Sequence, residues 1–220
     1  MCNRYRLSVK QRELLARYGI ESQFPADESY PPGTLEELFP ERPACVVRVD
    51  GDGGSKTLDV MRWGFPHEAP GANGRIVKKS VTNVRNLTSP FWRSALMNPV
   101  RRCLVPFTAF SEYGSTRGPD GKLPLHWFTL PALPIASFAG VWRPLESGGV
   151  FAFLTCEPNP LVAAIHPKAM PVVLRPEDEE RWLRADWEEA ARFASPFPAD
   201  LMAETREASV SKTPVQPELF

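Results

Sequence analysis

Cys2 stands directly after Met1, and cysteine is small enough for an initiator methionine to be trimmed away. We expect this trimming, which leaves one residue with both an α-amine, of pKa about 7.7 to 8.0, and a thiol, of pKa about 8.5. The amine can condense with an aldehyde to a Schiff base, and the thiolate of the same residue can then attack the imine carbon. The product is a five-membered thiazolidine ring, which an internal cysteine cannot form. The same terminus could instead attack an amide, as in hydrolases with an N-terminal nucleophile.

Two further residues could supply acid–base catalysis. Glu112 follows the run Thr-Ala-Phe-Ser, so we expect a desolvated carboxyl group with a raised pKa that can donate a proton. The alternative for Glu112 is an exposed strand carboxylate. His166 lies in AAIHPKAMP, at a predicted helix-to-strand turn where an imidazole can point into a cleft. The alternative for His166 is a hydrogen-bonded structural histidine.

The sequence carries no motif for a metal or a cofactor, and we expect neither. His67 and His126 share no ligand spacing with the cysteines, and there is no phosphate-binding glycine loop, no GxSxG and no Walker sequence. The other cysteines, Cys45, Cys103 and Cys156, lie in apolar runs typical of strands, so we interpret them as buried thiols.

The 26 basic and 26 acidic residues cancel in number but are unevenly distributed. The first twelve residues contain four basic residues and no acidic one. No acidic residue lies between Glu68 and Glu112, where the basic residues are Arg75, Lys78, Lys79, Arg85, Arg93, Arg101 and Arg102. If these two segments meet in space, they form a groove suited to a phosphate backbone, and Trp63, Phe65, Phe91 and Trp92 could stack on bases. Charge alone favours the alternative, in which the charges are solvated and the aromatic residues belong to the core.

The elements that must position these residues are mostly short strands. The 24 prolines are about twice the usual share of ~5%, which argues against a helical bundle. A hairpin is predicted over ACVVRVD, GDGG and KTLDVMRW, followed by strands at 101–105, 108–113, 123–130, 136–143 and 150–156. We therefore expect one α+β domain over residues 2–220, with a β meander or barrel and helices flanking an antiparallel core.

Helices are predicted near the two ends of the chain. Ser8–Gln11 is typical of a capping box for a helix near 9–18 that ends at Gly19. Residues 20–43 are expected to be irregular, with TLEELF as at most one turn. NPLVAAIH predicts a short helix, AMPVVL a strand, RPEDEERWLRAD an acidic helix, and Asp186 with Glu189 the cap of another. The tail SKTPVQPELF is expected to be extended at most.

The chain contains no run of 18 apolar residues, and its N-terminus lacks the apolar stretch of a signal peptide. We therefore expect a cytoplasmic protein that does not bind membranes.

Eight short motifs follow one another in an order that identifies a family. They are Met-Cys2-Asn-Arg4-Tyr, Trp63-Gly-Phe, Thr-Asn83-Val-Arg85, Phe91-Trp92, Arg102-Cys-Leu-Val-Pro106, Phe110-Ser-Glu112-Tyr, Gly140-Val-Trp142 and Ile165-His166-Pro-Lys-Ala-Met-Pro171. From residue 2 to about 185 the chain resembles the SOS-response-associated peptidase family, whose members are also called abasic-site processing proteins. The resemblance implies a β-rich pseudo-barrel of mainly antiparallel strands, with a groove for single-stranded DNA and the processed cysteine at its floor.

The resemblance also implies roles for individual residues. Members of the family crosslink covalently to abasic sites and shield the lesion from strand breakage. Cys2 would form the thiazolidine, and Asn83 would hold the terminus or the deoxyribose by hydrogen bonds. Glu112 would be the acid that opens the sugar ring, and His166 would assist Schiff-base chemistry, strand cleavage or reversal of the adduct.

The DNA contacts implied by the resemblance are Arg4, Arg85, Trp63, Thr155 and Lys168. Arg4 and Arg85 would clamp phosphates. Lys168 stands where arginine is frequent in the family, and a lysine cannot make a bidentate phosphate contact. The implied partner is single-stranded DNA with abasic sites, bound by a monomer that is associated with the nucleoid when on DNA.

Two other functions remain open from the sequence. The first is a cysteine peptidase that uses Cys2 with His166 and Glu112, if only to cleave its own N-terminus. The second is a non-covalent binder of single-stranded DNA, in which the basic segments and aromatic residues act without Cys2.

Overall fold

The structure is a computed structural model and describes residues 2–21, 37–51, 54–70, 73–119 and 121–206. Five strands close into a barrel in the order β11, β3, β2, β7 and β10, because β10 also pairs with β11. These strands are β2 (Pro43–Val49), β3 (Lys56–Trp63), β7 (Arg102–Phe107), β10 (Ala136–Leu145) and β11 (Gly148–Cys156). Only the β11–β3 pairing of this barrel is parallel. The expected α+β fold with a mainly antiparallel barrel is therefore confirmed.

The barrel interior is filled by aromatic side chains. Phe107 stacks on Phe138 with ring centroids 3.9 Å apart, and Phe138 lies 4.7 Å from Phe153. Gly140 leaves room for the side chains of β7, since a Cβ at that position would lie 2.8 Å from both Cys103 Sγ and Val105 Cγ2. Cys45, Cys103 and Cys156 are buried free thiols, as expected.

Short strands extend the barrel sheet. β6 (Asn83–Val84) pairs in parallel with β11, β12 (Met170–Pro171) pairs with the end of β11, and β13 (Val173–Leu174) pairs with β10. The predicted strand AMPVVL is thus split at Val172, whose amide donates to Leu154 while its carbonyl accepts from Ala139. The segment therefore leaves β11 and joins β10.

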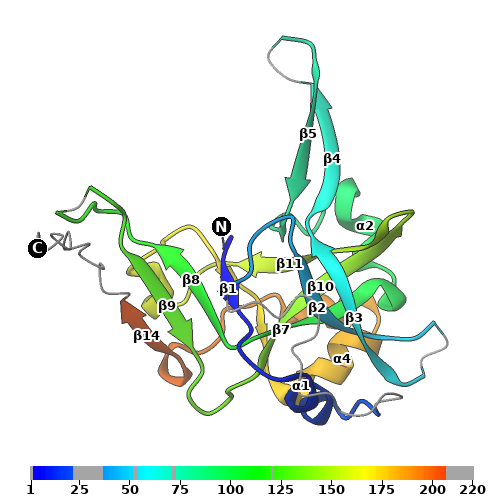
Figure 1. Cartoon of the computed structure of the whole chain (residues 1–220). Helices are drawn as coiled ribbons and strands as arrows, with labels where there is room; N and C mark the ends of the chain where they lie inside the picture. Colours follow the sequence, from blue (N-terminus) through cyan, green and yellow to red (C-terminus); the bar gives the residue numbers. More distant parts are fainter. Residues whose placement is uncertain (1, 22–36, 52–53, 71–72, 120, 207–220) are drawn as a thin grey trace, which may run out of the picture.

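A second sheet lies beside the barrel and begins with the N-terminal segment. Its order is β1 (Tyr5–Arg6), β8 (Ala109–Tyr113), β9 (Leu125–Thr129) and β14 (Ala203–Arg206). Figure 1 shows β1 next to β8, with β9 and β14 beyond it. β8 follows β7 after the single residue Thr108, so the barrel core and the second sheet are directly connected.

A two-stranded arm, β4 (Phe65–Pro70) and β5 (Ile76–Val81), projects from the molecule (Figure 1). Neither this arm nor the helix α2 (Pro90–Leu96) that follows it was predicted from the sequence. β4 and β5 are largely exposed, so they lack the apolar alternation on which strand prediction depends.

The remaining helices are short. They are α1 (Gln11–Tyr18), α3 (Pro160–Ala163), α4 (Glu179–Arg184) and α5 (Trp187–Ala190), with 3₁₀ turns at Pro99–Arg101, Pro176–Asp178, Ala191–Phe193 and Ala199–Leu201. Asp186 accepts a hydrogen bond from the Glu189 amide, which confirms the predicted cap of α5. None of the described helices is long and apolar enough to cross a lipid bilayer.

The predicted cap of α1 is wrong. The N-cap is Lys10, whose amide donates to Glu13 Oε2, and Ser8 lies before the helix. Gly19 does end α1 in the left-handed conformation, at φ 62°. Most of the segment 20–43 that was expected to be irregular, including the start of TLEELF, and the whole tail SKTPVQPELF lie outside the described residues.

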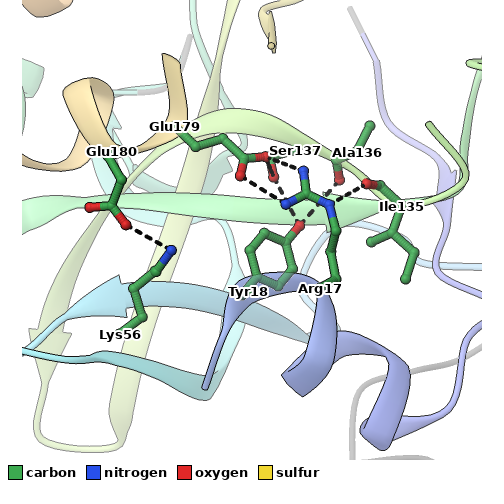
Figure 2. A network of polar contacts seen from close by, with 8 residues as sticks. All are labelled: Arg17, Tyr18, Lys56, Ile135, Ala136, Ser137, Glu179 and Glu180. Atoms are coloured by element: carbon green, nitrogen blue, oxygen red, sulfur yellow. Dashed lines mark hydrogen bonds and ion pairs between the residues drawn. The ribbon is translucent and has the colours of Figure 1, made fainter. Parts of the chain in front are cut away.

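α1 is anchored by a buried polar network, shown in Figure 2. Arg17 contacts the Glu179 carboxylate of α4 at 2.8 and 3.1 Å and donates to the carbonyl of Ile135. Ser137 of β10 donates to Glu179 at 2.7 Å and lies 2.9 Å from the Tyr18 hydroxyl. Because α1 follows β1 closely in the chain, this network also restrains the segment that carries Cys2.

Candidate active site

Cys2 is buried at the start of the segment that forms β1, with 1% of its surface exposed. Its Sγ lies 3.5 Å from the Arg4 carbonyl oxygen. The same oxygen accepts hydrogen bonds from the amide and the hydroxyl of Ser111, at 3.0 and 3.2 Å. The pairing of β1 with β8 therefore fixes where the thiol lies.

Asn83, in β6, also contacts Cys2. The parallel pairing of β6 with β11 sets Asn83 opposite Phe153, and the asparagine Nδ2 donates to the Cys2 carbonyl at 3.0 Å and to Thr82 Oγ1 at 2.7 Å. Asn83 Oδ1 is buried and has no hydrogen-bond partner among the described residues. This oxygen can accept a hydrogen bond from a substrate hydroxyl or an amine.

Glu112 extends from β8 into the same region, with 4% of its surface exposed. Burial raises the pKa of its carboxyl group from an ordinary 4.5 to about 7. Its Oε1 atom is also buried and has no partner within the described residues. Near neutral pH this group can therefore both hold and release a proton.

His166 lies next to Glu112, in the turn after α3, where its amide donates to the Val162 carbonyl at 2.7 Å. Its Nδ1 is 3.8 Å from Glu112 Oε2. Burial lowers the pKa of the imidazole, so the neutral ring is favoured near neutral pH and can accept a proton.

The thiol itself is not an activated thiolate. Burial, and after it the charge of Glu112, raises the pKa of Cys2 well above its ordinary value. The sulfur must therefore pass its proton to a neighbouring base before it attacks an electrophile.

Cys2, Asn83, Glu112 and His166 thus converge from different elements. Three polar neighbours were not singled out from the sequence: Thr82, Ser111, and Glu37, which pairs with Arg4 and Arg6. Thr82 and Ser111 directly precede Asn83 and Glu112 in the chain, and this adjacency was the one available signal. Glu37 is distant in sequence and gave none.

The residues expected to contact DNA are distributed less uniformly. Arg4 forms an ion pair with Glu37, and Arg85 pairs with Glu157 at 2.5 Å while donating to the Cys156 carbonyl at 2.9 Å. Lys168 is exposed two residues after His166. Thr155 is buried at the end of β11, and its hydroxyl has no partner among the described residues.

Trp63 is not available to a base, and this expectation is wrong. The indole is fully buried, stacks on Phe151 and Phe153, and meets the edge of Tyr5. Its Nε1 donates to the Thr82 carbonyl at 3.0 Å. Trp63 is therefore a core residue that supports the segment leading to Asn83.

Part of the basic segment is internal as well. Arg102 is fully buried, its guanidinium lies 5.5 Å from the ring of Trp182, and it donates to the Ala185 carbonyl. Burial lowers the pKa of Arg102 to about 10. Phe65 and Trp92 are buried in the core, whereas Arg75, Lys78 and Lys79 are exposed on the β4–β5 segment. The described ranges contain no cluster of three or more His, Cys, Asp or Glu side chains that could hold a metal ion.

Comparisons with known proteins agree with this architecture. The sequence matches the family described as SOS response associated peptidase (SRAP) over residues 1–217, beyond the stretch to about 185 in which motifs were found. No curated protein matches the chain.

Solved structures show the same fold. A protein from Bacteroides thetaiotaomicron has a TM-score of 0.72 and 21% identity, covering 93% of this chain and 91% of its own. A protein from Bordetella bronchiseptica has a TM-score of 0.69 and 22% identity, covering 94% of this chain and 99% of its own. A phage-related protein from the same organism has a TM-score of 0.67 and 16% identity, covering 94% and 95%.

Proposed function

The chain belongs to the SOS response associated peptidase family, and from this premise we propose that it captures abasic sites in single-stranded DNA as a thiazolidine on Cys2. The observation that carries the proposal is the convergence of the Cys2 backbone, the Asn83 amide, the Glu112 carboxyl and the His166 imidazole. A nucleophile, a proton donor and a proton acceptor are then within one buried site.

The first step is opening of the sugar. An abasic deoxyribose is mostly a closed hemiacetal, and only its open form offers an aldehyde. The protonated carboxyl of Glu112 donates a proton to the ring oxygen as the C1′–O4′ bond breaks, and His166 accepts the proton of the C1′ hydroxyl. The pKa of about 7 makes Glu112 effective in this role at neutral pH.

The second step is condensation. Once Met1 has been removed, the α-amine of Cys2 attacks C1′ and forms a carbinolamine, which loses one water to give an iminium ion. After ring opening the proton on His166 returns to Glu112, whose Oε2 lies 3.8 Å from His166 Nδ1, so Glu112 can protonate the departing hydroxyl and His166 is again neutral. The sulfur then transfers its proton to His166 and attacks C1′, and the electron pair of the C=N bond moves to nitrogen. The ring closes with loss of one water overall and without any change of oxidation state.

The DNA contacts follow from the same arrangement. Arg4, Arg85 and Lys168 are the cations nearest in sequence to Cys2, Asn83 and His166, and we assign them to backbone phosphates. Arg4 pairs with Glu37, and Arg85 pairs with Glu157. A phosphate must therefore displace each glutamate from its arginine or bind the arginine together with it. The unpartnered hydroxyl of Thr155 is assigned to the same strand.

A strand with one abasic site separates this function from the alternatives. Wild-type protein is expected to give a band shift that survives boiling in detergent, and an undamaged strand is expected to give none. Cys2→Ala should abolish the stable adduct. Cys2→Ser is the matched control: it keeps the amine, so it should form only a Schiff base that needs borohydride reduction to survive. A reduction-independent adduct of Cys2→Ser would refute the thiazolidine.

The family's printed name favours a second candidate, a peptidase that uses Cys2 as nucleophile. Burial raises the pKa of the Cys2 thiol, which disfavours the thiolate that attack on a peptide bond requires. Incubation with peptide libraries tests this candidate, because a true peptidase would hydrolyse many peptides per molecule whereas the proposed function predicts none.

A further inference from the structure

A pocket of about 400 Å³ is lined by residues that lie close in the chain to two active-site residues. Its walls include Gly114, in the loop after β8, and Ile165, in the turn after α3. Gly114 comes two residues after Glu112, and Ile165 directly precedes His166. Two chain segments therefore connect the pocket wall to Glu112 and His166, which perform the proposed chemistry.

His126 presents one edge of its ring to this pocket. The side chain is about nine-tenths buried, and the pairing of β8 with β9 sets His126 directly opposite Glu112. Its Nδ1 lies 2.7 Å from Glu204 Oε1 of β14. A carboxylate at Nδ1 fixes the orientation of the ring, so that Nε2 is directed away from β14.

Gly114 leaves space for that Nε2 atom. A Cβ at position 114 would lie 3.2 Å from His126 Nε2 and 2.9 Å from Pro124 Cγ. Such a methyl group would crowd the free edge of the imidazole. Glycine at this position therefore keeps Nε2 accessible from the pocket.

The pocket wall also carries cationic and hydroxyl side chains. Arg117, held by a hydrogen bond to the Gly121 carbonyl, and Arg206, the β14 residue paired with His126, both line it, together with Ser115. None of the described residues that line the pocket is acidic. Arg4 and Arg85, in contrast, each meet a glutamate.

We propose that this pocket is a subsite for one phosphate group of the DNA strand beside the lesion. Glu204 orients the His126 ring through Nδ1 so that Nε2 faces a phosphate oxygen, and Arg117 and Arg206 supply charge-assisted hydrogen bonds to the same group. The assignment to DNA rests on the proposed function, whereas the anion chemistry of the pocket does not.

The test measures binding without crosslinking. The probe is a fluorescent single strand with a tetrahydrofuran residue in place of the abasic site, which offers no aldehyde. In parallel strands a single phosphate on either side of the lesion is replaced by an uncharged methylphosphonate. For wild-type protein we expect one of these replacements to weaken binding by about 10-fold, the scale of one hydrogen bond to a charged group.

The double variant His126→Gln/Arg206→Ala should bind the unmodified strand about 10-fold more weakly and lose its sensitivity to that one replacement. Gly114→Ala is a second variant, which crowds the pocket without removing a charge. It should also bind the unmodified strand more weakly and lose its sensitivity to that one replacement. Arg192→Ala, which removes an exposed arginine outside the pocket, is the control and should keep the wild-type sensitivity.

Equal sensitivity of wild-type protein and both pocket variants to every methylphosphonate would overturn the proposal. The proposal would also be overturned if inorganic phosphate shifted the His126 NMR signals while no methylphosphonate changed the affinity for the strand. The pocket would then bind free phosphate and not the DNA backbone. Two assays separate the subsite from the thiazolidine. If Cys2→Ala keeps the wild-type sensitivity to the methylphosphonate, the subsite does not depend on Cys2. If, in addition, wild-type protein crosslinks no abasic strand, the subsite stands and the thiazolidine fails.

Discussion

At the scale of single residues, Glu112 links burial to chemistry most directly. Its carboxyl group has no partner on Oε1, and burial holds its pKa about where a general acid works at neutral pH. Glu112→Gln keeps the shape but cannot transfer a proton. We expect crosslinking to slow by roughly 10² to 10⁴, with nearly unchanged affinity for the strand. Single-turnover rates combined with binding anisotropy check this, and equal rates would remove Glu112 from the mechanism.

The pH dependence of crosslinking follows from the same pKa. The proton needed for ring opening is present below a pH of about 7 and is lost above it, so the contribution of Glu112 to the rate should decline as pH rises through about 7. A rate–pH profile for wild-type protein and Glu112→Gln measures the difference. The account predicts that the variant lacks this inflection, and an unchanged profile would contradict it.

Stability should show the matching linkage. The folded state binds the Glu112 proton more tightly than the unfolded chain, in which the pKa is near 4.5. The contribution of Glu112 is therefore fully present below about pH 4.5 and lost as pH rises through about 7, which amounts to about 3 kcal/mol. Urea unfolding at several pH values should show a free energy of unfolding that falls less steeply for Glu112→Gln than for wild type.

The sequence predicted the burial of Glu112 but not the environment of Trp63. Glu112 was expected to be desolvated because of the run before it, and the structure agrees. Trp63 shows the limit: an aromatic residue in a basic segment has the same sequence pattern whether it stacks on a base or lies between Phe151 and Phe153. Only the barrel closure, which is set by distant strands, decides between these environments.

At the scale of elements, α1 is fixed to α4 through Arg17 and Glu179, whose carboxylate is almost entirely buried. Glu179→Met leaves the Arg17 charge without its carboxylate, so we expect a loss of about 3 kcal/mol and a melting temperature lower by roughly 6 to 12 °C. Arg17→Met/Glu179→Met removes both charges and should recover most of the loss. A double variant as unstable as the single one would mean that the network contributes through packing instead.

Element prediction succeeded where the apolar pattern is local. The hairpin of β2 and β3 and the strands β7 to β11 are buried runs bounded by turns, and these were predicted close to their observed bounds. β1 and β6 have two residues each and are strands only because β8 and β11 pair with them. No local sequence pattern predicts such short strands, although they position Cys2 and Asn83.

At the scale of the whole molecule, the equal numbers of basic and acidic residues do not prevent basic side chains from binding a strand. Capture of the strand should weaken with salt, by about 0.7 log units per log unit of salt for each phosphate contacted. Arg85→Ala should reduce that slope by about one contact, and Arg192→Ala should not. Salt added after the adduct has formed should release nothing. Binding titrations at several salt concentrations test the first statement, and adduct loss at high salt would contradict the last.

The central claim is that a free α-amine and the thiol of Cys2 share one carbon of the sugar. Mass spectrometry of the N-terminal peptide, after crosslinking and digestion of the DNA, tests it most directly. The account predicts a peptide that begins at Cys2, without Met1, and carries the sugar remnant with the loss of one water at that residue. A crosslinked peptide that still carries Met1, or an adduct on any other residue, would contradict it.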